Sequence, residues 1–377
     1  MRDSRFLRRD ALQALLDLLG AQGFRVIGPV VRDGAVQYLD IDSAAQLPSA
    51  IHDHQSPGRY RLSDADAARC FAWANGLQAL KPYLFSAREV LWRSSRKADG
   101  GLTFDADAVA PKPIAVIGTR ACDLAALALH DLHFLDGIPD PAYAARRQDL
   151  FIVAVHCTHP AETCFCASTG DGPRATGGFD LALSELDHGF IVETGSDRGR
   201  QVAAQLPTEP VSEAQQQQAD AEIEAGALRQ VRRLPSRNLS GVLAARLEHP
   251  RWDQVAARCL SCGNCTSVCP TCFCHAQHDA PTLDGNDSEH VREWDSCFTE
   301  GHAYLHGYQI RPETRHRYRQ WMTHKLGSWH AQFGRSGCVG CGRCITWCPV
   351  GIDITEEANA VCADGATQPQ APSGDVS

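Results

Sequence analysis

The feature that most constrains this chain is a cysteine pattern that occurs twice in its C-terminal third. The first copy reads CLSCGNCTSVCP at 259–270, and the second reads CVGCGRCITWCP at 338–349. In each copy two, two and then three residues separate successive cysteines, and a proline follows the last one. This run is typical of bacterial proteins that bind two [4Fe–4S] clusters. The sequence therefore predicts two [4Fe–4S] clusters.

The spacing also predicts which cysteines share a cluster. The first three thiolates of each copy wrap around one cubane, while the fourth cysteine points toward the other cluster. One predicted ligand set is therefore Cys259, Cys262, Cys265 and Cys348, and the other is Cys338, Cys341, Cys344 and Cys269. Structural zinc is the alternative, but four-ligand zinc sites gain nothing from a third spaced cysteine or from the Cys-Pro ending.

A second group of cysteines lies upstream. Cys122 follows a short apolar run at 114–118, and Cys157 follows another at 150–156, with Cys164 and Cys166 close behind. If both runs are parallel neighbouring strands, the loops after them leave the sheet at the same carboxyl edge, where open α/β sheets build their sites. These four thiolates are candidate ligands of a third [4Fe–4S] cluster. Buried packing, a zinc site and a redox-active thiol pair are the alternatives.

Five of the 17 cysteines belong to none of these groups. Cys272, Cys274 and Cys297 lie behind the first cluster motif, where packing is the favoured interpretation and an additional site without an obvious fourth ligand is the other. Cys70 and Cys362 are isolated and are expected to be ordinary core or surface residues. In a chain of 377 residues, clustered cysteine spacings indicate metal binding rather than disulfides.

The remaining sequence predicts an α+β fold. Residues 1–240 have the pattern of a mixed α/β domain that carries the upstream cysteines, and residues 241–362 that of a mainly helical, ferredoxin-like dicluster domain with a long insertion. Residues 363–377 are expected to form a disordered tail. Within the first domain, apolar spacing predicts a helix that includes Phe6 and ends at Gly20. Strands are expected at 24–31, 35–42, 114–118, 150–156 and in a hairpin over 179–195, and a helix or linker at 211–233.

The insertion between the two motifs contains a basic, aromatic stretch. Residues 301–336 hold six Lys or Arg and a single acidic residue, Glu313. One interpretation is a solvated helix whose arginines also balance the anionic clusters. The other is a docking face for an acidic partner, where complementary charge would speed encounter.

Charge and motif content exclude several function classes. The net charge of −9 argues against nucleic-acid binding. No apolar run approaches the length of a membrane span, and Asp10, Gln13 and Asp17 interrupt the segment after the twin arginine at 8–9, so we expect no export signal and a cytoplasmic protein. The sequence has no G-x-G-x-x-G loop and no P-loop, which argues against a nucleotide or flavin site in this chain. The histidines beside Cys157, His156 and His159, are expected to pack or to tune a cluster rather than to catalyse.

Six strings together resemble a known family: GTRACDLAAL, HCTHPAETCFCAS, CPTCFC, WDSCF, RYRQWMTHKL and SGCVGCGRCITWCP, between about residues 110 and 355. The chain is similar to the β subunits of soluble sulfhydrogenases, which are NAD(P)-linked [NiFe] hydrogenases, and to the corresponding iron–sulfur subunit of anaerobic sulfite reductase. The resemblance implies a non-catalytic electron-transfer subunit in a hetero-oligomer. Its expected partners are a flavin subunit that exchanges electrons with NAD(P)H and a catalytic subunit that carries [NiFe] or sirohaem.

Two other functions remain open from the sequence. The upstream group of Cys122, Cys157, Cys164 and Cys166 could reduce thiols or disulfides, which would make the chain an enzyme. Alternatively, the clusters could be structural or sensory parts of a binding module. The negative net charge disfavours the nucleic-acid-linked form of that module.

Overall fold

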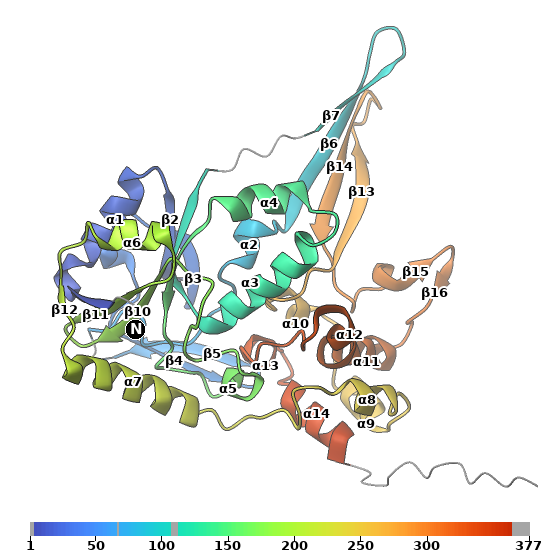
Figure 1. The fold of residues 1–377 in the computed structure, drawn as a ribbon. Helices are drawn as coiled ribbons and strands as arrows, with labels where there is room; N and C mark the ends of the chain where they lie inside the picture. The colour runs from blue at the N-terminus through green and yellow to red at the C-terminus, as the bar shows by residue number, and fades with distance from the viewer. Residues whose placement is uncertain (1–3, 66–67, 107–111, 364–377) are drawn as a thin grey trace, which may run out of the picture.

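The computed structural model describes residues 4–65, 68–106 and 112–363 (Figure 1). Helices and sheets occur together in it, so the predicted α+β class is confirmed. The predicted tail, apart from Ala363 at the end of the last helix, lies outside the described residues. Within the described residues, no helix is both long enough and apolar enough to cross a bilayer.

An eight-stranded mixed sheet forms the centre of the N-terminal region. Its strands lie in the order β12 (Thr208–Pro210), β1 (Ser4–Arg8), β11 (Gly189–Thr194), β10 (Leu181–Leu186), β9 (Phe151–Val155), β8 (Ile114–Thr119), β2 (Arg25–Arg32) and β3 (Ala35–Asp40). The four strands β10, β9, β8 and β2 run parallel, and the flanking pairs are antiparallel.

The two apolar runs that precede the upstream cysteines are the adjacent strands β8 and β9. Every residue of both strands is buried, as expected for parallel strands that are covered on both faces. They pair in parallel, with Val116 opposite Ile152. The expectation that their following loops share one edge of the sheet is therefore confirmed.

Helices cover both sides of this sheet (Figure 1). On one side α1 (Leu12–Ala21) packs against α6 (Asp197–Ala203), and on the other α7 (Glu213–Leu228) packs against β10 and β11. The predicted helix or linker at 211–233 is thus a helix, begun by a capping box in which Ser212 and Gln215 bond each other's backbone N–H. After β8 the chain forms α3 (Ala121–Phe134) and α4 (Pro141–Gln148).

The helix predicted to include Phe6 begins later in the chain. Residues Ser4–Arg8 form β1, where Phe6 pairs with Ile191 on one side and with Glu209 on the other. A short 3-10 turn, η1 (Arg9–Ala11), leads into α1. The apolar spacing was correct for Leu12 onward, but long-range strand pairing decides the conformation of the first residues.

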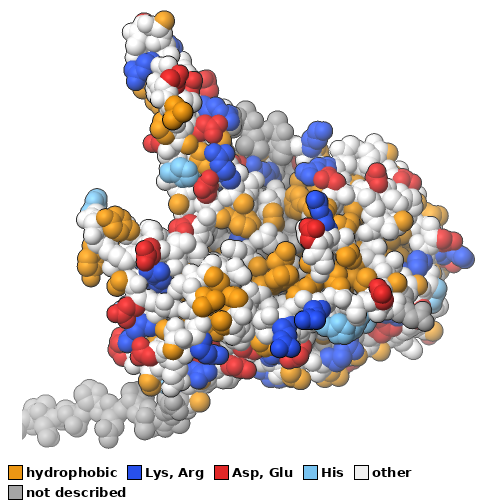
Figure 2. Space-filling view, turned by 180° about the vertical axis from the view of Figure 1, so that it is seen from behind, with side chains coloured by type: hydrophobic (Ala, Val, Ile, Leu, Met, Phe, Trp, Pro, Cys, Tyr) orange, Lys and Arg blue, Asp and Glu red, His pale blue; other side chains and the backbone are white. Residues whose placement is uncertain are grey.

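A second, four-stranded sheet projects from the body as an arm (Figure 1). It joins two hairpins from distant parts of the chain, β6 (Arg88–Arg96) with β7 (Leu102–Ala106), and β13 (His275–Pro281) with β14 (Asp287–Trp294). Figure 2 shows side chains of both charges along this arm. The arm links segments from either side of the domain boundary predicted at residue 240, and that boundary stays a prediction.

The dicluster region is built from short helices around a second hydrophobic core that includes Trp252, Tyr318 and Met322. These helices are α8 (Ser240–Ala244), α9 (Arg251–Ala256), α10 (Asn264–Ser267), α11 (Thr314–Thr323), α12 (Trp329–Phe333), α13 (Arg343–Thr346) and α14 (Ile354–Ala363), with a π-helical turn η4 (His324–Ser328) between α11 and α12. The smaller elements of the fold are η2 (Ala44–Gln46), β4 (Ile51–Ser56), β5 (Arg59–Asp64), α2 (Lys81–Leu84), α5 (Cys166–Thr169), η3 (Gly301–Ala303), β15 (Tyr304–Leu305) and β16 (Tyr308–Gln309).

The basic stretch of the insertion is largely occupied by contacts within the chain. Arg315 and Arg319 bind the carboxylate of Glu248. Arg317 is buried and donates to three backbone carbonyls, and Lys325 is also buried. These contacts favour an internal structural role over a docking face for an acidic partner.

Candidate metal centres

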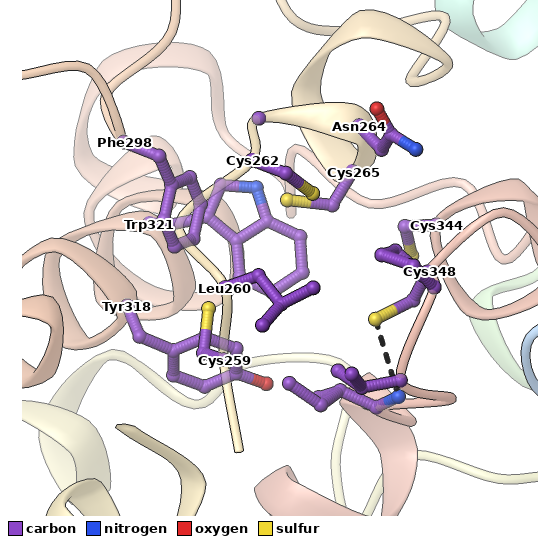
Figure 3. A pocket seen from close by; sticks show the side chains of 14 residues that line it. Cys259, Leu260, Cys262, Asn264, Cys265, Phe298, Tyr318, Trp321, Cys344 and Cys348 are labelled. Atoms are coloured by element: carbon purple, nitrogen blue, oxygen red, sulfur yellow. Dashed lines mark hydrogen bonds between the residues drawn. The ribbon is translucent and has the colours of Figure 1, made fainter. Parts of the chain in front are cut away.

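The first predicted ligand set lines a single cavity. Cys259, Cys262 and Cys265 come from the loop that enters α10, and Cys348 comes from the loop after α13. Their side chains converge around a cavity of about 430 Å³ (Figure 3). Gly263 turns the loop with a φ of 76°, a left-handed conformation that glycine adopts without strain.

The walls of this cavity suit a buried, negatively charged inorganic group. Phe298, Tyr318 and Trp321 make it apolar and keep water away. Two backbone N–H groups point at its sulfur atoms, that of Ser261 at Cys259 (3.4 Å) and that of Ile352 at Cys348 (3.3 Å). Burial raises the pKa of the Cys259 thiol, so a bound metal would have to displace its proton. The four thiols, the enclosed space and the N–H donors all fit a [4Fe–4S] cluster.

The second predicted ligand set also comes together in the structure. Each of Cys338, Cys341 and Cys344 interacts electrostatically with Cys269, which arrives from the first motif. Cys269 accepts a hydrogen bond from the thiol of Cys272. Lys325, in the π-helical turn, donates to Thr271 Oγ1 at 2.8 Å. Although burial opposes it, the nearby thiols of Cys269 and Cys272 raise the pKa of this lysine, which places a fixed positive charge beside the set.

The upstream cysteines lie together at the carboxyl edge of β8 and β9. Cys122 is in the first turn of α3, Cys157 follows β9, and Cys166 begins α5. Cys166 interacts electrostatically with Cys122 and Cys157, and Cys164 interacts with Cys166 and Cys157. The structure therefore brings the four thiols of the candidate third centre to one place.

Two buried amides that the sequence analysis did not identify donate to this group. The side-chain amide of Asn75 donates to Cys122 Sγ at 3.3 Å, and that of Gln230 donates to Cys166 Sγ at 3.3 Å. Donors of this kind stabilise negative charge on sulfur. Their partners lie 47 and 64 residues away in the sequence, so no local motif could have indicated them.

The second and third groups of thiols share a wall. Cys341 interacts electrostatically with Cys122, Cys164 and Cys166 as well as with Cys269, and its carbonyl accepts from the Cys164 thiol at 3.7 Å. The contact is tight because Gly340 and Gly342 lie against the 163–166 loop. A Cβ on Gly340 would come within 2.6 Å of Cys166 Cα. The glycines of the second motif therefore permit close packing of these two groups.

The arrangement of the thiols differs from that of a mononuclear site. Among the residues that the structure describes, no three His, Cys, Asp or Glu side chains are arranged to bind one metal ion. Thiolates around a cubane lie farther apart than those around a single ion, because each binds a different iron atom. The wide spacing within the three groups is thus compatible with clusters.

The histidines beside Cys157 have structural roles. His156 is buried, accepts from the backbone N–H of Ala175 at 3.1 Å through Nδ1, and contacts Glu193 through Nε2 at 3.2 Å. Burial and the neighbouring Arg229 lower the pKa of His159 to about 4, so it is neutral at physiological pH. Of the isolated cysteines, Cys70 is buried beside Glu185 and Cys362 is half-buried.

Comparison with known proteins supports these assignments at a coarser level. Residues 258–352 match the family model described as a 4Fe–4S dicluster domain, which indicates two [4Fe–4S] clusters. The chain is 33% identical over 241 residues to sulfhydrogenase 2 subunit beta of Pyrococcus furiosus, an alignment that covers 63% of this chain and 71% of the relative. No solved structure matches the chain significantly. The chain is an iron–sulfur electron-transfer protein and belongs to the family of sulfhydrogenase β subunits.

Proposed function

We propose that this chain is the electron-relay subunit of a hetero-oligomeric oxidoreductase. Its partners are a flavin-containing subunit that exchanges electrons with NAD(P)H and a metal-containing catalytic subunit, either a [NiFe] hydrogenase or a sirohaem sulfite reductase. The observation that carries the proposal is the row of three thiol groups, in which Cys344 lines the first cavity and belongs to the second group, while Cys341 contacts the third. The proposal places the complex in the cytoplasm, where thiols remain reduced.

The proposed ligand sets are those suggested by the sequence: Cys259, Cys262, Cys265 and Cys348 for one cluster, and Cys338, Cys341, Cys344 and Cys269 for the other. When bound, the clusters supply one-electron redox chemistry. The chain itself holds the thiolates, excludes water with aromatic walls, and directs N–H groups and a lysine at the sulfur atoms. These positive groups favour the more negative, reduced state and so raise the reduction potential.

We further propose a third [4Fe–4S] cluster on Cys122, Cys157, Cys164 and Cys166. Support comes from the mutual contacts of these thiols and from the two amides that donate to them. The competing function, disulfide reduction at this site, has less support. Cys122, Cys164 and Cys166 are each at most 9% exposed, so a disulfide substrate could not reach them.

The two ends of the row differ in their surroundings. At the first cavity Cys262 is exposed, and the neighbouring Leu260 is 64% exposed. At the far end Cys157 interacts with Asp53 and Arg229, which line an open polar groove of about 1040 Å³. A row with one accessible apolar end and one accessible polar end suits a relay between two different partners.

The third cluster is tested by the variant Cys164→Ser. The anaerobically purified wild-type chain is expected to hold about twelve iron atoms, and the variant about eight, because one of three cubanes loses a thiolate ligand. Iron analysis and EPR of the dithionite-reduced protein measure this. Cys362→Ser is the matched control and should keep the wild-type iron content. A wild-type content of about eight iron atoms would show that the upstream thiols hold no cluster.

The relay is tested by Cys344→Ser in the assembled complex. Electron transfer from NAD(P)H to the catalytic subunit is expected to fall at least tenfold, since one cluster in the row loses a ligand and such losses cost about 10–100-fold in activity. Reduction of a dye by the flavin subunit should be unchanged, because that reaction does not need the row. If the dye reaction were lost as well, the chain would have a role in the flavin chemistry and the relay proposal would be wrong.

A further inference from the structure

Cys274 and Cys297, which the sequence analysis assigned to packing, meet at the base of the β13–β14 hairpin. Cys274 directly precedes β13, and Cys297 follows β14 after a two-residue gap. The backbone N–H of Asp295 donates to the carbonyl of Cys274 at 2.9 Å, which continues the strand pairing to this point. The two thiol side chains share a hydrogen bond. The hairpin thus brings together two cysteines that are distant in sequence.

A histidine and a carboxylate complete this arrangement. His302 forms a hydrogen bond with the Cys274 side chain, and its Nδ1 donates to Asp295 Oδ2 at 2.7 Å. Asp295 is fixed in turn by the N–H of Ser296 (2.7 Å) and by the hydroxyl of Thr299 (2.6 Å). This is a chain of thiol, imidazole and carboxylate in which the carboxylate orients the ring and favours its charged form.

The electrostatics separate the roles of the two sulfur atoms. Hydrogen bonds from Cys297 and His302 lower the pKa of Cys274 to about 4, and the bond with Cys274 raises the pKa of His302 to about 9. At neutral pH the group therefore contains a Cys274 thiolate, a His302 imidazolium and a protonated Cys297 thiol. A low-pKa thiolate beside a second thiol is typical of redox-active cysteine pairs.

The pair lies beside both clusters of the dicluster domain. Cys297 interacts electrostatically with Cys265, a proposed ligand of the first cluster. Cys274 interacts with Cys272, whose thiol donates to Cys269 of the second ligand set. Cys274, Cys297 and His302 are half-buried, so the pair has clusters on its inner side and partial access to solvent.

A metal site is a poorer explanation of the same residues. Cys274, Cys297 and His302 provide three donors, whereas a structural zinc site needs four. In the described ranges of the chain, no three such donors are arranged for a single ion. The direct hydrogen bond between the two sulfurs also differs from the wide spacing of the thiols in the three proposed cluster sites.

We propose that Cys274 and Cys297 form a redox-active thiol pair that converts reversibly between dithiol and disulfide, with electrons from the neighbouring iron–sulfur centres. Reduction breaks one S–S bond and takes up two electrons and two protons. One proton forms the Cys297 thiol, and the other resides on His302 beside the Cys274 thiolate. Oxidation forms the S–S bond and returns the two electrons and two protons.

This pair adds a two-electron store to a row of one-electron carriers. A disulfide between these residues would also close the base of the arm covalently, because the two cysteines flank the paired strands β13 and β14. The inference rests on the presence of the two dicluster-domain clusters. It does not depend on the third cluster or on the identity of the partner subunits.

Reductive titration of the intact, cluster-loaded chain tests the proposal. Protein oxidised with thionine is titrated anaerobically with dithionite, and the electrons taken up per chain are counted. The wild-type chain is expected to take up about two electrons more than Cys274→Ser or Cys297→Ser, as required for one disulfide. Cys362→Ser is the control and should match the wild type. Equal uptake by the wild type and both variants would overturn the proposal.

Differential alkylation with mass spectrometry provides a second, independent readout. In the oxidised wild-type chain, Cys274 and Cys297 should resist alkylation together and appear in one cross-linked peptide. In the reduced chain both should be alkylated. Free thiols at both positions in the oxidised chain would overturn the proposal. It would also be overturned if Cys274→Ser lost bound iron or zinc in metal analysis, because Cys274 would then be a metal ligand.

Discussion

Replacing Cys348 by serine is expected to abolish the cluster bound by the first motif, although Cys348 belongs to the second. Cys348 lines the same cavity as Cys259, Cys262 and Cys265, and it receives the N–H of Ile352 at the edge of that cavity. We expect Cys348→Ser to lose about four iron atoms per chain. The EPR spectrum of the reduced variant should match that of Cys259→Ser, because both substitutions remove a ligand of one cluster and leave the other intact.

The reciprocal pair of variants provides the control. Cys269→Ser and Cys338→Ser should also lose about four iron atoms each and should share a residual spectrum, one that differs from the first pair. If Cys348→Ser instead gave the residual spectrum of Cys338→Ser, each motif would bind its own cluster and the crosswise assignment would be wrong. The comparison uses four substitutions of the same size, so differences among them report ligation rather than volume.

The cysteine groups could be predicted from the sequence because their chemistry is encoded locally. Motif spacing alone groups Cys259 with Cys262 and Cys265, and the expected adjacency of two strands brings Cys122 to Cys157. That adjacency depends only on two fully apolar runs, which are typical of buried parallel strands. The structure pairs these runs as β8 and β9, with Val116 opposite Ile152.

The arm could not be predicted in the same way. Its strands β6 and β13 read REVLWRSSR and HAQHDAP, which have little apolar alternation. They form strands because segments almost 200 residues apart pair, as when Glu289 lies opposite Arg93. The same holds for Phe6, whose segment pairs with β11 and β12 although its local spacing suggested a helix. Cross-strand pairing stabilises such segments where local propensity is weak.

The arm also explains why the thiol pair went unrecognised. Cys274 and Cys297 carry no spacing motif, and only the β13–β14 register brings them together with His302. The buried lysine beside the second cluster, Lys325, was likewise counted among the basic residues of a solvated helix. A π-helical turn places it inside, and such turns occur often at functional sites.

A buried ion pair joins the dicluster domain to the upstream thiol group. Arg343 Nη2 donates to Asp123 Oδ1 at 2.7 Å, and the two side chains are 1% and 2% exposed. Arg343 precedes Cys344 in α13, and Asp123 follows Cys122 in α3. The pair therefore fixes the second motif against the helix that carries a proposed ligand of the third cluster.

Arg343→Met is expected to lower the free energy of unfolding by about 3–5 kcal/mol, because it leaves the Asp123 carboxylate buried without its partner. Anaerobic urea unfolding of the cluster-loaded chain measures the loss. The double variant Arg343→Met/Asp123→Asn should recover most of it, since it leaves no unpaired charge inside. In the exposed pair Arg25–Asp40, Arg25→Met should cost no more than about 1 kcal/mol. Equal losses for the two single variants would mean that water reaches Asp123, and the second and third thiol groups would then not share a dry wall.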